Sequence, residues 1–262
     1  MKLIQNLPNI LTLFNLFLGC MGVVYLYNDH MVIMTGKQEF FIDMGLINLA
    51  CYCVMLAGVV DFFDGFVARA LKVESALGKQ LDSLADVVTF GLVPGLIMYQ
   101  LLARAYYVHY NAFDYPILYF STGFLVTIFA AVRLARFNID ERQKTGFLGL
   151  PTPAMAMIIV SLPPMLLRNE LGLLTTLQNH WVLLGLVILL SYLMMSEIPM
   201  LSLKFKSFGW QENQWVYGLL LISIFVGFTA IFIFNILFAV IPILLFLYII
   251  ISITKNIKEN GL

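Results

Sequence analysis

The chain has 262 residues, of which 61% are hydrophobic and only 11% are charged. Soluble globular domains contain about 45–50% apolar and about 25% charged residues. Together with a mean hydropathy of +0.92, this composition excludes a soluble enzyme and a disordered chain. Lys and Arg number 15, as do Asp and Glu, so a basic surface for nucleic acid is excluded as well. We therefore predict an all-α fold, a polytopic transmembrane helical bundle.

Apolar runs along the chain set the expected number of membrane spans. A spanning helix needs about 20 mostly apolar residues, because the hydrocarbon core is about 30 Å thick. Runs of this kind predict about eight spans, of which the fifth and sixth are short for a bilayer. In chain order they are Leu7–Tyr27, Phe40–Ala70, Gly78–Leu102, Tyr115–Arg136, Thr152–Leu167, Trp181–Met195, Trp215–Phe234 and Leu237–Thr254.

The basic residues set the expected orientation. With eight spans, twelve of the 15 Lys and Arg residues fall on one side of the membrane, and only Lys37, Arg104 and Arg168 fall on the other. Cytoplasmic loops are enriched in Lys and Arg. We therefore expect both termini in the cytoplasm. Since no organelle-targeting segment is apparent, we expect the protein in the plasma membrane, as a single integral membrane domain over residues 1–262.

Four of the acidic residues lie in two apolar segments at the expected cytoplasmic side. They are Asp61, Asp64, Asp82 and Asp86. Carboxylates within a membrane are costly and normally face a polar cavity. Their spacings of three and four place each pair on one face of a helix, and residues 72–77 are few enough to join the two helices as an antiparallel hairpin. We therefore expect the four carboxylates to converge at its cytoplasmic end. The small residues on the same two faces are Gly65, Ala68 and Gly78.

Carboxylates that share a pocket need cations or protons to neutralise them. Hard divalent cations prefer oxygen ligands, and Mg²⁺ or Mn²⁺ often lie where carboxylates meet substrate phosphates. We expect two such ions per site, able to clamp a diphosphate during displacement at phosphorus. Arg69 offers a fixed cation to a phosphate or a carboxylate. Taken singly, an aspartate could instead cap a helix, and the small residues could serve plain helix packing.

These residues also form a known pattern. Asp61-x-x-Asp64-Gly65-x-x-Ala68-Arg69, then eight residues, then Gly78-x-x-x-Asp82-x-x-x-Asp86, resembles the signature of the CDP-alcohol phosphatidyltransferase family at every position. The resemblance implies a homodimeric membrane enzyme with a six-helix catalytic core. It further implies transfer of a phosphatidyl or phospho-alcohol group from a CDP-linked donor to a hydroxyl, with release of CMP. We expect residues 1–200 to form the catalytic core and residues 201–262 an additional helical hairpin.

Further segments are similar to the branch of the family that uses serine as the acceptor. They are LPNILTLFN at 7–15, DSLAD at 82–86, RLARFN at 133–138 and FLGLPTPA at 147–154, so the resemblance covers roughly residues 5–165. It implies CDP-diacylglycerol and L-serine as substrates at an active site that faces the cytoplasm. The rival acceptors are glycerol 3-phosphate and inositol phosphate, which carry a phosphate and predict a denser cationic pocket.

The resemblance also assigns roles to individual residues. Asp61, Asp64 and Asp82 would bind or share both metals, and Asp86 would complete the second metal site. Asp86 is also the best general base, since the serine hydroxyl is a weak nucleophile that gains from proton removal. The residues expected to contact CDP-diacylglycerol are Asn9, Thr12, Gly65, Ala68, Arg69 and Gly78. The residues expected to contact serine are Arg133, Arg136, Asn138 and Thr152.

Plainer explanations remain open for some of these residues. Asn9 and Thr12 could cap the first helix, and Arg133 and Arg136 could anchor the fourth helix at the cytoplasmic surface rather than bind a carboxylate through their guanidinium groups. From another class of protein, an ion-coupled transporter would also hold intramembrane acids. Such transporters often show two related halves, and no internal repeat is visible in this sequence.

Overall fold

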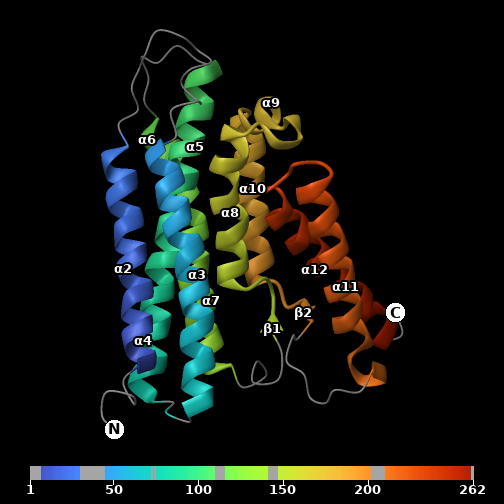
Figure 1. The fold of residues 1–262 in the computed structure, drawn as a ribbon. Helices are drawn as coiled ribbons and strands as arrows, with labels where there is room; N and C mark the ends of the chain where they lie inside the picture. The colour runs from blue at the N-terminus through green and yellow to red at the C-terminus, as the bar shows by residue number, and fades with distance from the viewer. Residues whose placement is uncertain are drawn as a thin grey trace.

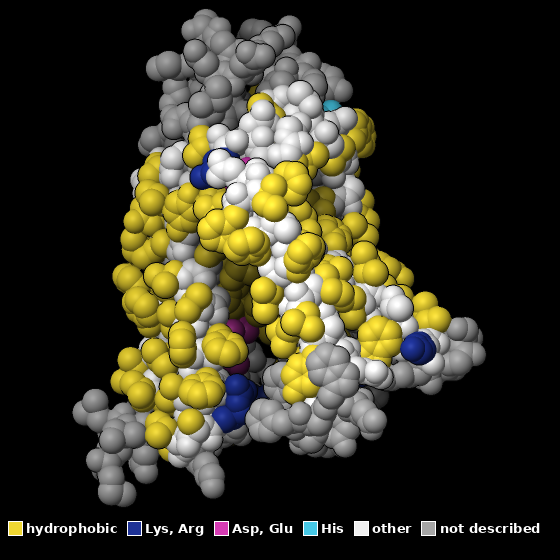
Figure 2. All heavy atoms as spheres, turned by 45° about the vertical axis from the view of Figure 1, so that its right-hand side comes forward, with side chains coloured by type: hydrophobic (Ala, Val, Ile, Leu, Met, Phe, Trp, Pro, Cys, Tyr) yellow, Lys and Arg dark blue, Asp and Glu magenta, His cyan; other side chains and the backbone are white. Residues whose placement is uncertain are grey.

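A computed structural model of the chain describes residues 7–29, 45–71, 73, 75–109, 116–140, 147–201 and 210–260. These residues form an elongated helical bundle, with α2 and α3 on one side and α11 and α12 on the other (Figure 1). The only strands among them are two residues long each, so the expected all-α class is confirmed. The outer surface of the helices is mostly hydrophobic (Figure 2). An apolar surface of this extent suits contact with lipid, whereas in water it would favour aggregation.

The N-terminal half consists mainly of long helices. A π-helical turn, η2, lies between α4 and α5, and the three form one continuous helix. The elements are α2 (Leu7–Asn28), α3 (Gly45–Leu71), α4 (Ala76–Asp86), η2 (Val87–Leu92), α5 (Val93–His109), α6 (Ile117–Phe120), the 3₁₀ turn η3 (Ser121–Phe124) and α7 (Leu125–Ile139).

The second half is built around shorter helices. Almost all of α8 is buried at the centre of the bundle, while α11 and α12 form a hairpin at its edge (Figure 1). The elements are β1 (Phe147–Leu148), α8 (Thr152–Leu167), the 3₁₀ turn η5 (Glu170–Gly172), α9 (Leu174–Leu177), α10 (His180–Met195), β2 (Pro199–Met200), α11 (Trp210–Phe232) and α12 (Val240–Asn260).

Six helices of the described chain are long and apolar enough to cross a membrane, and two shorter apolar helices accompany them. Each of the eight predicted runs therefore contains a helix, although residues 40–44 and 115 lie outside the described part. The last two runs were predicted slightly too long where they meet, because α11 ends at Phe232 and α12 begins at Val240. The predicted end of the third run at Leu102 was wrong, because the helix continues to His109. Arg104 stays within it because the buried side chain pairs with Asp29 at 2.5 Å.

Close contacts at small residues bring the helices of the site together. A Cβ atom at Gly19 would lie 2.4 Å from the Thr89 hydroxyl oxygen, so α2 crosses η2 at a point where no side chain fits. On the opposite side, the Thr127 hydroxyl of α7 donates to the Gly91 carbonyl at 2.9 Å. The π turn thus lies between α2 and α7. Single π turns within α-helices often occur at functional sites, and the sequence pattern did not predict this one.

Glu170 attaches the last hairpin to the rest of the bundle. Its side chain is 3% exposed and pairs with Arg168 at 3.0 Å. Its carboxylate also accepts hydrogen bonds of 2.8–3.0 Å from the backbone N–H groups of residues 237, 238 and 239, directly before α12 begins. Free backbone donors and the helix dipole both favour a carboxylate at this position.

Candidate active site

The hairpin of α3 and α4 brings three of the four predicted aspartates together. One carboxylate oxygen each from Asp61, Asp64 and Asp82 lies within 4.8 Å of the others. The sequence spacing predicted this convergence. The structure accounts for it, because only a short connection separates the end of α3 at Leu71 from the start of α4 at Ala76. Ser75 caps α4 by accepting a 2.9 Å hydrogen bond from the Gly78 backbone N–H. The cap sets where the second helix begins and therefore at which level Asp82 meets the other two carboxylates.

Neutral donors from α2 reach two of the aspartates. The Thr12 hydroxyl donates to Asp64 Oδ2 at 2.8 Å, and Asn15 Nδ2 donates to Asp86 Oδ1 at 3.4 Å. Within the described residues, no Lys or Arg side chain forms an ion pair with any of the four aspartates. The described residues therefore give their negative charge no basic counterpart, and charge that is wholly or partly buried in this way is costly unless a cation or a proton meets it.

Asn15 is a site residue that the sequence analysis missed. It is fully buried, contacts Asp86, and its own Oδ1 has no hydrogen-bond partner among the described residues. The available signal was its position three residues after Thr12, which places both side chains on the same face of α2.

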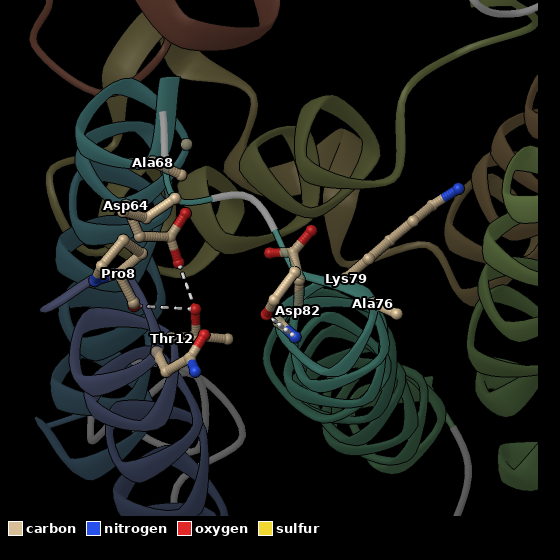
Figure 3. A pocket seen from close by; sticks show the side chains of 12 residues that line it. Pro8, Thr12, Asp64, Ala68, Ala76, Lys79 and Asp82 are labelled. Carbon is tan, nitrogen blue, oxygen red and sulfur yellow. Dashed lines mark hydrogen bonds between the residues drawn. The ribbon is translucent and has the colours of Figure 1, made fainter. Parts of the chain in front are cut away.

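A cavity of about 460 Å³ lies against these carboxylates. Asp64 and Asp82 face each other across it, and Thr12 lies below Asp64 (Figure 3). Lys79 extends away from the two aspartates, and its Nζ donates to the Asn138 carbonyl at 3.3 Å. Polar and small residues from α2, α3 and α4 complete the wall. The lining residues are Pro8, Asn9, Thr12, Asp64, Gly65, Ala68, Val73, Ser75, Ala76, Gly78, Lys79 and Asp82.

The structure places five of the six predicted donor-binding residues in this lining, and Arg69 is the exception. The Arg69 side chain is exposed and lies near Gly65, with a guanidinium nitrogen 3.7 Å from the position of a Cβ at that glycine. Gly78 allows Asn9 to approach closely, since a Cβ at Gly78 would lie 2.9 Å from Asn9 Oδ1. Small residues thus keep this face open to a ligand.

Asp86 is buried and lies about one turn beyond Asp82 along α4. It is 7% exposed, it is the last residue of α4, and the π turn begins at the next residue. It is not part of the group of three carboxylates within 4.8 Å of one another. Its predicted roles as metal ligand and general base remain predictions.

A second, smaller cavity lies beside α7. It measures about 40 Å³ and contains the two predicted arginines together with two acidic residues. Arg133 is 6% exposed, and its Nε and Nη2 have no hydrogen-bond partner among the described residues. The lining residues are Arg133, Arg136, Asp140, Leu148, Met194, Met195, Ser196 and Glu197. Asp140 and Glu197 were not predicted from the sequence.

The other two predicted serine contacts lie apart from this lining. Asn138 Nδ2 donates to the Ser83 hydroxyl at 2.8 Å, which ties α7 to α4. Thr152 is fully buried at the start of α8, and its hydroxyl has no partner among the described residues. Neither residue lines the small cavity, so their contact with serine remains a prediction.

Contacts between α7 and the α4–η2 segment show at which depth in the bundle Asp86 and Arg133 lie. The helices run antiparallel, with Asn138 bonded to Ser83 at one level and Ala130 against Gly91 two turns away. Arg133 lies between these two levels on α7, and Asp86 lies between them on the α4–η2 segment. A buried carboxylate and a buried guanidinium with unpaired nitrogens therefore lie at similar depth. In the space-filling view, acidic atoms lie within a hollow of the surface, with Lys or Arg side chains near its lower edge (Figure 2).

The aspartate group suits a divalent metal. Oxygen ligands of one Mg²⁺ lie about 2.1 Å from it, and hence up to about 4.2 Å apart. The three oxygens, within 4.8 Å of one another, need only a small closure to reach that arrangement. All are carboxylate oxygens, the donor type that Mg²⁺ and Mn²⁺ prefer.

Fold and site together define a polytopic helical membrane protein with a carboxylate group beside a cavity. The profile of the CDP-alcohol phosphatidyltransferase family matches residues 5–195. The chain therefore belongs to the CDP-alcohol phosphatidyltransferase family, as the signature predicted, and is a membrane enzyme of that family.

Several proteins with assigned names are similar to this chain. The chain is 33% identical over 219 residues to a CDP-diacylglycerol–serine O-phosphatidyltransferase of Helicobacter pylori, covering 83% of this chain and 80% of the relative. A Bacillus subtilis protein of the same name is 32% identical over 44% of this chain and 60% of its own length. An archaetidylserine synthase of Methanothermobacter thermautotrophicus is 34% identical over 45% of this chain and 47% of its own length.

Proposed function

We propose that this enzyme transfers the phosphatidyl group of CDP-diacylglycerol to the hydroxyl of L-serine, giving phosphatidylserine and CMP. The observation that carries the proposal is the aspartate group beside a cavity, together with Asp86 at similar depth to a pocket that contains the buried Arg133 and residues of both charges. The names of the similar proteins from Helicobacter pylori and Bacillus subtilis support serine as the acceptor.

The donor nucleotide fits the larger cavity. A volume of about 460 Å³ lies within the range typical of small-molecule sites, about 300–1,000 Å³. Asn9 and Thr12 would contact the cytidine or its phosphate, and Gly65, Ala68 and Gly78 would let the nucleotide lie close to the backbone. Arg69, exposed at the end of α3, would reach a phosphate from outside the cavity.

Asp61, Asp64 and Asp82 would hold one or two Mg²⁺ or Mn²⁺ ions, with Asp86 completing the second site. When bound, such ions neutralise charge on the diphosphate and on the departing CMP. Thr12 orients Asp64 by hydrogen bonding to one of its carboxylate oxygens, which leaves the other oxygen to a ligand. Asp61 and Asp82 approach from the two helices of the hairpin, so the hairpin itself sets the size of the site.

Asp86 would act as the general base. Its carboxylate would accept the proton of the serine hydroxyl as the serine oxygen attacks the phosphorus on the diacylglycerol side. The bond between that phosphorus and the bridging oxygen then breaks, and CMP leaves with the bridging oxygen. Asn15 holds Asp86 through Oδ1, so one oxygen is oriented while the other is available to the acceptor.

The mixed charge of the small pocket favours serine over the rival acceptors. Arg133 and Arg136 would bind the serine carboxylate, and the acidic residues Asp140 and Glu197 supply the charge that an ammonium group requires. Glycerol 3-phosphate and inositol phosphate carry a phosphate and no amine, so two carboxylates in the pocket would repel them. A cavity of about 40 Å³ holds about three water-sized groups. It would therefore enclose the polar end of serine and leave the hydroxyl outside it.

The finer topology is also a proposal. We expect eight spans, both termini and the active site at the cytoplasmic face of the plasma membrane, a catalytic core over residues 1–200, and a homodimer. Two cations expected on the opposite side, Arg104 and Arg168, each form an ion pair. Because they are paired, these two arginines count less as positive charges when the orientation is inferred from Lys and Arg. A reporter fused after Leu262 should read as cytoplasmic, and an extracytoplasmic reading would contradict eight spans. Cross-linking in membranes would test the dimer.

An acceptor panel tests the chemistry. Purified enzyme with CDP-diacylglycerol and Mn²⁺ or Mg²⁺ is offered serine, glycerol 3-phosphate or inositol phosphate, and CMP release is measured. We expect release with serine alone, and release only with another acceptor would overturn the assignment. Asp86→Asn should abolish turnover and leave CDP-diacylglycerol binding largely intact. Near-normal turnover would remove Asp86 as the base.

A further inference from the structure

Three polar side chains of α12 form a stripe that faces the β1–β2 pair. Tyr248, Ser252 and Asn256 are spaced by four residues and therefore lie on one face of the helix. They belong to the last hairpin, outside the residues 5–195 that match the family profile. Their hydrogen bonds nevertheless reach back to the segment that follows α10.

The stripe bonds to the backbone around β2 at three points. The Tyr248 hydroxyl donates to the Leu201 carbonyl at 2.9 Å, and the Ser252 hydroxyl accepts from the Leu201 N–H at 3.0 Å. Asn256 Nδ2 donates to the Pro199 carbonyl at 2.6 Å. Ser252 is 1% exposed and Leu201 4%, so these bonds replace water at buried backbone groups, which are costly to leave unpaired.

The β2 segment in turn holds the loop before α8. Leu148 pairs with Pro199 across the strands, and the Gly149 N–H donates to the Ile198 carbonyl at 2.9 Å. Gly149 has φ of +69°, and a Cβ there would lie 2.6 Å from the Ser196 carbonyl. This tight contact allows only glycine and presses the loop onto the end of α10.

The same elements form the wall of the pocket around Arg133. Leu148, Met194, Met195, Ser196 and Glu197 line it together with the α7 side chains. All five come from β1, the end of α10 or the segment before β2, and are held by the contacts just described. Figure 1 shows β2 between α10 and α12.

We propose that the stripe Tyr248–Ser252–Asn256 is a positioning element for the acceptor: it holds the β1–β2 pair in the geometry that lets the Arg133 pocket bind serine. The C-terminal hairpin thereby takes part in acceptor binding without touching the reacting atoms. This inference rests on the proposed function, in which that pocket receives serine.

The test measures the Michaelis constants of both substrates on the full-length enzyme. Ser252→Ala and the double variant Tyr248→Phe, Ser252→Ala should raise KM for serine. A hydrogen bond contributes about 0.5–1.5 kcal/mol, so the expected rise is about threefold for the single and about tenfold for the double variant. KM for CDP-diacylglycerol and the Mn²⁺ dependence should stay within about twofold of wild type. Ser252→Thr keeps a hydroxyl and should restore most of the serine affinity.

The matched control is Thr254→Ala on the same helix. The Thr254 hydroxyl donates only within α12, to the Ile250 carbonyl, and is exposed, so KM for serine should not change. An unchanged serine KM in the double variant, or equal changes in both Michaelis constants, would overturn the inference. Failure of the proposed function is recognised separately, because wild-type enzyme would then release CMP with another acceptor. The same variants are in that case measured with that acceptor, where an unchanged KM again contradicts the positioning role.

Discussion

Two acidic groups inside the helical bundle differ in how the protein compensates their negative charge. Glu170 receives three backbone N–H donors and pairs with Arg168. The group of Asp61, Asp64 and Asp82 receives a hydroxyl hydrogen bond from Thr12 and has no Lys or Arg ion pair within the described residues. The chain itself satisfies the first, so that carboxylate holds the fold together. The described residues do not meet the charge of the second, as expected for the ligand site proposed above.

The largest expected effect is on catalysis, at the unsatisfied group. Asp82→Asn should lower turnover by about 1000-fold or more, because it removes a ligand of the proposed metal. The same change should leave the melting temperature of the metal-free protein equal or slightly higher, since it removes a partly buried charge that no basic residue among those described compensates. CMP release and thermal unfolding measure the two effects. An Asp82→Asn enzyme with ordinary turnover would remove this residue from the site.

Removal of the cation tests the same group without mutation. Chelation with EDTA should abolish CMP release, and added Mn²⁺ should restore it. Mn²⁺ at about 100 times its Kd should stabilise the wild-type fold by about 2.7 kcal/mol. It should not stabilise an Asp61→Asn, Asp82→Asn double variant. Equal stabilisation of both proteins would place the ion elsewhere.

At Glu170, whose charge the protein itself compensates, we expect a loss of stability rather than of activity. Glu170→Gln should lower the free energy of unfolding by about 2–4 kcal/mol, because buried N–H donors lose a charged acceptor. Turnover per folded molecule should stay within about twofold. Arg168→Gln is the matched control. Its side chain is 41% exposed, so the loss should be at most about 1 kcal/mol. If Glu170→Gln instead abolished turnover without loss of stability, the comparison between the two acidic groups would fail.

The smallest effect concerns the shape of the donor cavity. Gly78→Ala would place a Cβ 2.9 Å from Asn9 Oδ1 and force that side chain to move. We expect KM for CDP-diacylglycerol to rise about fivefold, with KM for serine nearly unchanged. Gly185→Ala serves as the control, since nothing lies within 4 Å of a Cβ at Gly185 in α10. A larger effect at Gly185 than at Gly78 would contradict a role for Gly78 in admitting the donor.

Much of the site could be predicted because it lies in one local hairpin. Asp61 and Asp64 share a face of α3, and Asp82 lies on the facing helix after a short connection, so helical periodicity alone brings them together. The eight apolar runs were found for a similar reason, since each is a continuous segment. The end of α5 was misplaced because Arg104 has a partner in Asp29, 75 residues away in the chain, and no local pattern reveals that pairing.

The sequence by itself determined the membrane class, the helical elements and the aspartate hairpin, because all three depend on composition and on residues close together in the chain. Only the tertiary structure decided which distant groups meet: Asn15 with Asp86, Glu170 with the start of α12, and the α12 stripe with β2. It also decided which buried charges are satisfied by the protein. Hydrogen bonds between remote segments depend on how the helices pack, and helix packing is a property of the whole bundle rather than of any one segment.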